Sequence, residues 1–301
     1  MKKRPFIFIL FIIVSLFLYS CSFEELNQVI DNALIEEQNE ETDTYENQLQ
    51  ITYIDVGQGD SAFIQFPNGK TMLIDAGESS AYEKISKSID STKTTHIDVI
   101  VATHPHADHI GSMANIIKNY SIGKIYMPKA TSNTKTFETL LQTIADHNLK
   151  ITEAKNGVTI NLDETVAVEI LSPISAKYDD TNNYSVVLKI TYKDTSFLFT
   201  GDAEIFVEEE LIDNGLDISA DVLKVGHHGS TTSTSAAFLR NVRPTYAIIS
   251  VGADNSYGHP KQKVLDRLAD FGVTVYRTDE LGTITLTSNG DDIIISTISS
   301  N

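Results

Sequence analysis

Three histidines and one aspartate within six positions are the residues of this chain best suited to do chemistry. They form the pattern H-x-H-x-D-H at His104, His106, Asp108 and His109, directly after the apolar run "VIVAT". A spacing of two on an extended segment lets His104 and His106 point at one ion, while Asp108 and His109 can turn toward a second from the start of a helix. Imidazole nitrogens and carboxylate oxygens suit zinc and also accept manganese. The pattern predicts one or two divalent metal ions, Zn or Mn.

The remaining histidines gather at similar positions along the chain. Six of the eight lie in three segments that follow predicted strands, and the other two of these segments carry His227 with His228, and His259. The segments "IDVIVATHPHADHIGS" and "ADVLKVGHHGSTTS" repeat one order of Asp, strand, His, small polar residues and helix. Because sites in α/β proteins usually lie at strand ends, we expect two strand–helix halves to bring these histidines together. His96 and His147 are assigned to structure.

The segments between these motifs predict the elements that position them. Alternating apolar residues and a "PNGK" turn predict a β-meander over 49–77, and a hairpin around "KDT" is predicted over 184–204. Helical patterns fall between the remaining strands, over 81–91, 111–120, 136–148, 205–215, 233–242 and 260–272. This order indicates one α/β domain over 49–301, with two mixed sheets and helices outside.

The first 48 residues have a different character. Three basic residues precede the apolar run "PFIFILFIIVSLFLYS", which predicts a signal peptide over 1–20. Cys21, the only cysteine, follows a small residue and resembles the lipobox of bacterial lipoproteins, which predicts lipidation at Cys21 and an extracytoplasmic, membrane-anchored protein. An ordinary secretory signal with a chance cysteine is the alternative. Nine acidic and no basic residues in 22–48 make 21–48 an acidic tether.

The charge of the domain bears on its substrate. From Leu49 onward the chain has 32 acidic and 20 basic residues, a net charge of −12. Nucleic-acid binding driven by a basic surface needs the opposite sign. A local cluster could offset the charge near the site, formed by Lys224, Arg240, Arg243, Lys261 and Lys263.

Five motifs in order resemble those of metallo-β-lactamase-fold hydrolases, and in particular the extracellular hydrolase domain of ComEC-type competence (DNA-uptake) proteins. The motifs are "DVGQGDSAFIQFPNGKTMLIDAG", "THPHADHIG", "FLFTGDAE", "VLKVGHHGS" and "SVGADNSYGHP", and the resemblance covers 49–301. It implies a four-layer αββα sandwich with the metal site at one edge of the two sheets. It also implies that Asp202 bridges two metals, that His227 completes the second site with Asp108 and His109, and that Asp75 orients a ligand histidine.

The chain departs from the family pattern in two respects. The wider superfamily has another histidine, a ligand of the first metal, between H-x-H-x-D-H and "GD", whereas here only His147 lies there, inside a predicted helix. The first site, with His104, His106 and Asp202, is therefore poor in ligands, and it could bind weakly, use Asn183 or water, or prefer a harder ion such as manganese. ComEC-type proteins also carry many membrane spans, which this sequence lacks, so we do not expect it to import DNA by itself.

Several polar residues are candidates for substrate contact. Asn255, Tyr257 and His259 form a polar loop suited to contacting a phosphate, with His259 as donor of a proton to the leaving oxygen. Ser230 is expected at a helix start, where N-capping and phosphate contact are both reasonable roles. We take His228 as a structural neighbour of His227, and Gln58 and Asp60 as turn residues near the cleft.

The predicted chemistry is hydrolysis by metal-activated water. Two metals about 3.5–4 Å apart lower the pKa of a shared water to about 7, with Asp108 orienting that water. The motifs favour a phosphodiesterase acting on single-stranded DNA, with DNA-uptake machinery as a partner. The negative charge favours a smaller phosphodiester, such as a wall polymer, headgroup or nucleotide. A non-catalytic metal- or DNA-binding lipoprotein is a further alternative, and β-lactamase activity ranks third because nothing marks a penicillin pocket.

Overall fold

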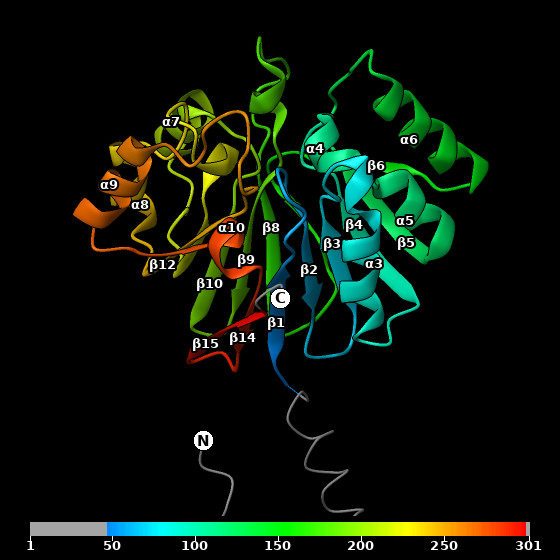
Figure 1. Cartoon of the computed structure of the whole chain (residues 1–301), viewed down its shortest axis with the longest axis horizontal. Coiled ribbons are helices and arrows are strands. Elements are labelled where there is room, and N and C mark those ends of the chain that lie inside the picture. The colour runs from blue at the N-terminus through cyan, green and yellow to red at the C-terminus, as the bar shows by residue number, and fades with distance from the viewer. Residues whose placement is uncertain (1–46, 299–301) are drawn as a thin grey trace, which may run out of the picture. The chain divides into compact units, whose positions relative to one another are not determined.

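Two mixed β-sheets lie face to face at the centre of the domain, and helices cover the outer face of each sheet (Figure 1). The computed structural model describes residues 47–298. The predicted signal peptide, the lipidation site Cys21 and nearly all of the acidic tether lie outside the described residues. Within residues 47–298, no helix is long and apolar enough to cross a bilayer.

The first sheet has eight strands among the described residues, in the order β15-β14-β1-β2-β3-β4-β5-β6. Its antiparallel part consists of the predicted meander β1 to β3 together with β14 and β15, and β3 to β6 run parallel. The strands are β1 (Leu49–Tyr53), β2 (Ala62–Gln65), β3 (Thr71–Ile74), β4 (His96–Val101), β5 (Ser121–Met127), β6 (Ile151–Glu153), β14 (Thr283–Ser288) and β15 (Ile293–Ile298). The helices on this side are η1 (Ser79–Ala81), α3 (Tyr82–Asp90), α4 (Ala107–Ile110), α5 (Met113–Asn119) and α6 (Lys135–Asp146).

The second sheet has seven strands in the part of the chain that the structure describes, in the order β13-β12-β11-β10-β9-β8-β7. They are β7 (Val158–Thr159), β8 (Val166–Ser172), β9 (Val187–Tyr192), β10 (Thr195–Phe199), β11 (Val222–Lys224), β12 (Tyr246–Ile249) and β13 (Thr274–Arg277). The helices of this half are η2 (Thr181–Tyr184), α7 (Ile205–Asp213), η3 (Gly226–Gly229), α8 (Ala236–Val242), α9 (Gln262–Asp270) and α10 (Thr278–Leu281). Strands β10 to β13 are parallel, so their carboxyl ends meet at one edge.

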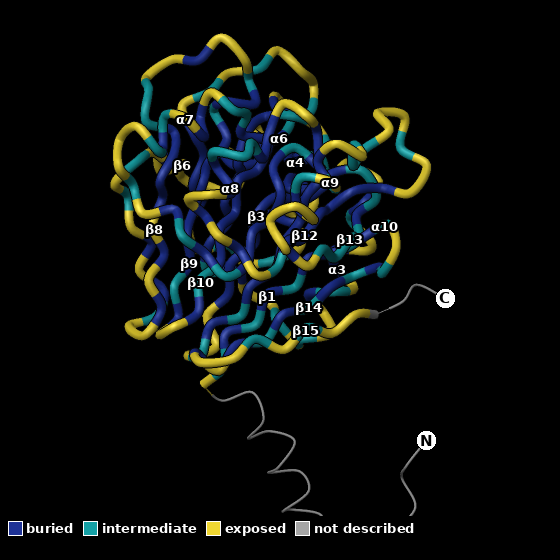
Figure 2. The backbone as a smooth tube through the Cα atoms, turned by 90° about the vertical axis from the view of Figure 1, so that its left-hand side faces the viewer, coloured by how far each residue is buried: buried dark blue, intermediate teal, exposed yellow. Residues whose placement is uncertain are grey.

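Three separate apolar clusters hold the layers together. One lies between the sheets and includes Ile51, Ile64 and Ile190. A second packs α3, α5 and α6 on the first sheet, and a third packs α7, α8 and α9 on the second. Central strands such as β3 are buried on both faces, and Figure 2 shows the interior strands buried beneath exposed loops. The predicted four-layer αββα sandwich is confirmed.

Two helices differ from their predicted bounds in ways that matter for the site. The helix expected over 111–120 is α5 and begins only at Met113, while the separate one-turn helix α4 precedes it. Gly111 lies between the two helices, where it donates to the Gly77 carbonyl at 2.7 Å and where a side chain would collide with Ser79. The helix expected over 233–242 begins at Ala236, where the Ser235 hydroxyl accepts the Phe238 N–H. Ser230 is therefore not the N-cap of this helix, which was one of the two roles predicted for it.

Candidate metal centre

The predicted metal ligands lie on loops that follow three strands. The segment after β4 carries His104 and His106 and leads into α4 with Asp108 and His109, the segment after β10 carries Asp202, and η3 after β11 carries His227 and His228. Because β4 belongs to the first sheet and β10 and β11 to the second, the site forms where the two sheets end together.

One group of four side chains has the spacing of a metal site: Asp108, His109, Asp202 and His228. Asp202 Oδ1 lies 3.3 Å from His109 Nε2 and 3.5 Å from His228 Nε2. Asp108 Oδ2 lies 3.3 Å from His228 Nε2 and 3.8 Å from His109 Nε2. Metal–ligand bonds of about 2.0–2.2 Å in tetrahedral geometry separate ligand atoms by roughly 3.3–3.6 Å, so the four residues fit one divalent ion.

The hydrogen bonds of this group support the same fit. His109 Nδ1 lies 2.8 Å from Asp75 Oδ2, and His228 Nδ1 lies 2.9 Å from the Ser250 carbonyl. Both Nδ1 atoms therefore carry the proton, which leaves each Nε2 as a bare acceptor. Both Nε2 atoms and Asp202 Oδ1 are buried without a hydrogen-bond partner. Unpartnered buried acceptors that converge on one point are what a cation requires.

The structure places His228, rather than the predicted His227, in this group. Both residues have left-handed backbone angles, with φ of 48° and 53°. This turn rotates His228 inward until its side chain is 2% exposed, whereas the side chain of His227 stays 23% exposed. The geometry therefore favours His228 as a metal ligand, whereas the sequence analysis had assigned it a structural role.

The first predicted site is more open. His104 Nε2 lies 3.0 Å from His106 Nδ1 and 4.0 Å from Asp202 Oδ2. The two oxygens of Asp202 thus face different groups, Oδ1 toward His109 and His228 and Oδ2 toward His104. This position agrees with the bridging role that the family resemblance implies for Asp202.

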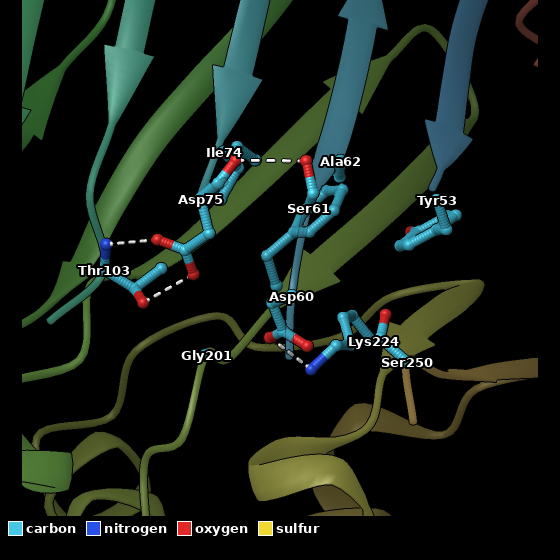
Figure 3. Close-up of a pocket in the computed structure, with 11 residues that line it drawn as sticks. Tyr53, Asp60, Ser61, Ala62, Ile74, Asp75, Thr103, Gly201, Lys224 and Ser250 are labelled. Carbon is cyan, nitrogen blue, oxygen red and sulfur yellow. Dashed lines mark hydrogen bonds and ion pairs between the residues drawn. The ribbon is translucent and has the colours of Figure 1, made fainter. Parts of the chain in front are cut away.

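Asp75 holds His109 from behind. Its Oδ1 accepts the backbone N–H of Thr103 at 2.8 Å, and its Oδ2 accepts the Thr103 hydroxyl at 2.7 Å (Figure 3). The same Oδ2 also accepts the His109 Nδ1 proton. Burial raises the pKa of Asp75 despite the compensating contact with His109. The arrangement sets the tautomer and orientation of His109, as predicted from the resemblance.

A buried ion pair underlies the site and was not predicted. Lys224 Nζ lies 2.5 Å from Asp60 Oδ2, and both side chains are at most 9% exposed (Figure 3). Burial alone would raise the pKa of Asp60, but Lys224 and His228 outweigh it and lower the pKa to about 2. Lys224 was expected in a basic cluster near the substrate, but as a buried partner of Asp60 it cannot supply surface charge.

The site opens into a cleft of about 350 Å³. This volume lies in the range of small-ligand sites. The cleft is lined by Gln58, His106, Ala107, Asp108, Asn182, Asp202, His227, His228, Tyr257 and His259.

The loop after β12 forms one wall of the cleft. Tyr257 is 62% exposed, and its ring stacks on His259 with centroids 5.8 Å apart. Burial, together with the neighbouring His227 and His228, lowers the pKa of His259 to about 4, so its imidazole is neutral at pH 7. The Asn255 amide donates to the carbonyls of Gly252 and His259 and accepts the His259 N–H. Asn255 thus shapes the loop and has no polar atom free for the predicted substrate contact.

Two further predicted residues lie outside the cleft lining. Asn183 Oδ1 accepts the backbone N–H of Glu204 at 3.2 Å, while its neighbour Asn182 lines the cleft with a buried, unpartnered Oδ1. The Ser230 hydroxyl accepts the Thr232 N–H in a local turn and is 6% exposed. The sequence analysis therefore missed Asn182. The segment "DDTNNYSVVL" had indicated this part of the chain, but only Asn183 had been predicted as a candidate.

Comparison with known proteins agrees with this geometry. A family model described as "Metallo-beta-lactamase superfamily" matches residues 54–253, which contain the H-x-H-x-D-H motif, Asp202 and both adjacent histidines. The chain belongs to the metallo-β-lactamase superfamily. It is thus a metal-dependent hydrolase by family, with a His/Asp cluster suited to a divalent ion.

Relatives of this superfamily member include competence proteins. It is 34% identical over 252 residues to ComE operon protein 3 of Bacillus subtilis (strain 168), covering 78% of this chain and 32% of that protein. It is 30% identical over 241 residues to competence protein ComA of Neisseria gonorrhoeae, covering 79% of this chain and 32% of that protein. The chain thus spans about a third of the length of these curated relatives, and the predicted resemblance to ComEC-type proteins is confirmed.

Solved structures agree on the fold. The diiron β-hydroxylase CmlA from Streptomyces venezuelae superimposes with a TM-score of 0.55 at 15% identity, covering 79% of this chain and 54% of that chain. This similarity shows the metallo-β-lactamase fold alone.

Proposed function

We propose that this protein is a membrane-anchored, extracytoplasmic phosphodiesterase that cleaves single-stranded DNA with the help of bound divalent ions. The observation that carries the proposal is the buried group of Asp108, His109, Asp202 and His228, whose unpartnered acceptors converge at the floor of a 350 Å³ cleft. The identity with competence proteins supports DNA as the substrate and DNA-uptake machinery as a partner.

Asp108 is suited to orient the attacking water. Divalent ions bound at the site supply Lewis-acid polarisation of the phosphodiester and activation of water. Asp108 and Asp202 both line the cleft, but the side chain of Asp108 is 25% exposed whereas that of Asp202 is 3% exposed. Burial would raise the pKa of Asp108, but the neighbouring His109 and His228 outweigh it and hold the pKa well below its usual range. Asp108 therefore stays ionised and accepts a hydrogen bond from water.

His259 is suited to the leaving oxygen on the opposite wall. Its Nδ1 is buried without a partner, and its imidazole is neutral at pH 7. A phosphodiester anion in the cleft raises the pKa of a neighbouring imidazole. His259 can then take up a proton and pass it to the departing oxygen, which is the role predicted for it.

Tyr257 favours a single strand over a duplex. An exposed aromatic ring beside a catalytic cleft stacks on an unpaired base, which contributes about 1–3 kcal/mol per base. Asn255 donates to the His259 carbonyl and Lys261 donates to the Tyr257 carbonyl. These hydrogen bonds hold the loop in place, so the stacking surface of Tyr257 is preformed. None of the cleft-lining residues, all within 47–298, is Lys or Arg. Ions held by Asp108, His109, Asp202 and His228 would supply the positive charge opposite the phosphate at the reacting bond.

A smaller phosphodiester is the second candidate. The net charge of −12 on residues 49–301 and a cleft of 350 Å³ favour a substrate with few phosphates. A wall polymer, headgroup or nucleotide meets this description. A non-catalytic lipoprotein that binds metal or DNA is less well supported, because the metal-binding group lies at the floor of an open cleft that gives a substrate access to it.

One experiment separates these candidates. Purified full-length protein is stripped of metal, supplied with Mn²⁺ or Zn²⁺, and incubated with labelled single-stranded DNA, duplex DNA and bis-p-nitrophenyl phosphate. We expect single-stranded DNA to be cut in a metal-dependent way, and Asp202→Ala to abolish cleavage. Hydrolysis of the small ester without DNA cleavage would favour the second candidate. DNA binding without turnover under any metal would refute the enzyme.

A further inference from the structure

The turn that carries the two adjacent histidines is strained. His227 has φ 48° and ψ 47°, and His228 has φ 53° and ψ 25°. Left-handed conformations cost free energy for a residue with a Cβ, and such residues concentrate at functional sites. In an extended strand, adjacent side chains point to opposite faces. Here both rings line the same cleft, so the strained turn gives both histidines access to one site.

The ring of His227 is oriented as a ligand toward Asp202. Its Nε2 lies 3.7 Å from Asp202 Oδ2, the oxygen turned away from the His109 and His228 group. Its Nδ1 lies 3.2 Å from the Thr232 hydroxyl and 3.8 Å from Glu204 Oε1. When the Thr232 hydroxyl accepts a hydrogen bond from Nδ1, the Nε2 lone pair of His227 faces Asp202.

The same Asp202 oxygen faces the first pair of histidines. It lies 4.0 Å from His104 Nε2, which is itself 3.0 Å from His106 Nδ1. His104 Nδ1 contacts the hydroxyls of Thr103 and Ser185, so its Nε2 also points into the site. The alternative ligand Asn183 has its oxygen engaged by the Glu204 N–H.

We propose that His227 completes the first metal site together with His104, His106 and Asp202 Oδ2. The adjacent histidines would thus be divided between two ions, His227 on the first and His228 on the second, with Asp202 between them. His227 replaces the histidine that the superfamily supplies from elsewhere in the chain. This inference rests on the metal-dependent part of the proposed function and is independent of the substrate.

Metal stoichiometry tests the assignment directly. Full-length protein is stripped of metal and titrated with Mn²⁺ by calorimetry, and bound metal is counted by elemental analysis after desalting. The variants are His227→Gly and His228→Gly, because glycine adopts positive φ without strain. His147→Ala is the control, since His147 caps α6 and bonds to Thr143. We expect two ions in the unaltered protein and the control, and one in each variant.

Two further measurements keep the result interpretable. The melting temperature of metal-free His227→Gly should not fall, and His227→Asn, which also tolerates positive φ, serves as a second variant if it does. In the His227→Gly background, His106→Ala should leave the count at one, whereas Asp108→Asn should reduce it to zero. Electron paramagnetic resonance spectra of the Mn²⁺ forms should show magnetically coupled ions only in the unaltered protein and the control.

Three results would overturn the proposal. They are two ions bound by His227→Gly at unchanged affinity, one ion bound by the unaltered protein, and loss of both ions from His227→Gly. Two ions in the unaltered protein and one in His227→Gly, without DNA cleavage by the unaltered protein, would remove the nuclease and leave this assignment in place.

Discussion

Replacing Asp75 by asparagine should weaken metal binding and lower the stability of the fold only modestly. Asp75 accepts three hydrogen bonds, two from Thr103 and one from His109 Nδ1. Asparagine has the same shape but only one oxygen. If that oxygen keeps the Thr103 N–H, the amide NH₂ takes the Oδ2 position and faces His109 Nδ1. His109 must then present a bare Nδ1 and carry its proton on Nε2, the atom that faces the metal site.

The magnitude of the two effects follows from these contacts. Loss of the partner that orients a ligand histidine typically costs 10–100-fold in metal affinity, which is about 1.4–2.7 kcal/mol. Losing a hydrogen bond to a charged group costs about 1.5–3 kcal/mol of folding free energy. Because burial raises the pKa of Asp75, a neutral asparagine also removes a desolvation cost. We therefore expect the folding cost to lie near the lower end of this range, at about 1.5 kcal/mol. For a domain of this size this lowers the melting temperature of metal-free Asp75→Asn by about 3–6 °C.

Asp221 provides a matched control away from the site. Its Oδ2 accepts the backbone N–H and the hydroxyl of Ser196, each at 2.8 Å, which repeats the pattern of Asp75 and Thr103 without a histidine. Asp221→Asn should lower the melting temperature by a similar amount and leave metal affinity unchanged. Affinity is measured by competition with a chelating indicator, and stability by calorimetry of the metal-free proteins. Wild-type affinity in Asp75→Asn, or an equal loss in Asp221→Asn, would refute the tautomer argument.

The remaining predictions concern three other regions. Tyr257→Ala should raise the KM for single-stranded DNA by roughly 5–150-fold and leave the hydrolysis of bis-p-nitrophenyl phosphate unchanged. Tyr257→Phe, which keeps the aromatic ring, should retain the KM of the unaltered protein for DNA. Equal effects of Tyr257→Ala on both substrates would exclude base stacking. Gly59→Ala should displace the loop beside the site and lower metal affinity and the melting temperature, because its Cβ would lie 2.3 Å from the Asp108 carbonyl oxygen at φ 133°; a calorimetric profile like that of the unaltered protein would contradict this. Hydrogen bonding from Lys189 lowers the pKa of Asp217 to about 2, so this pair stabilises the fold above pH 4 and the contribution disappears as the pH falls through 2. Since the Asp217 side chain is 77% exposed, Asp217→Asn should cost under about 1 kcal/mol at pH 7, and a urea-unfolding difference that persists below pH 2 would argue against the pair.

The layers of the fold and the residue types of the site could be predicted from the amino-acid sequence. Alternating and continuous apolar runs marked the strands because burial on one or two faces is a local property of each segment. The short edge strand β6 and the four-residue α10 were missed, since neither is long enough to show a period. The histidines, Asp108 and Asp202 were found because metal ligands must follow strand ends, and this spacing is visible along the chain.

Which of those residues lie together around one ion depends on the tertiary structure. His228 rather than His227 joins Asp108 because two successive left-handed residues rotate the rings, and no propensity predicts such strain. Lys224 pairs with Asp60 across the two sheets, a contact between residues far apart in the sequence. Local patterns specify which face of an element is buried, whereas the packing of one sheet on another specifies which polar groups meet at its edge. The sequence therefore specifies which residue types form the site, and the packing of the two sheets specifies their distances and orientations.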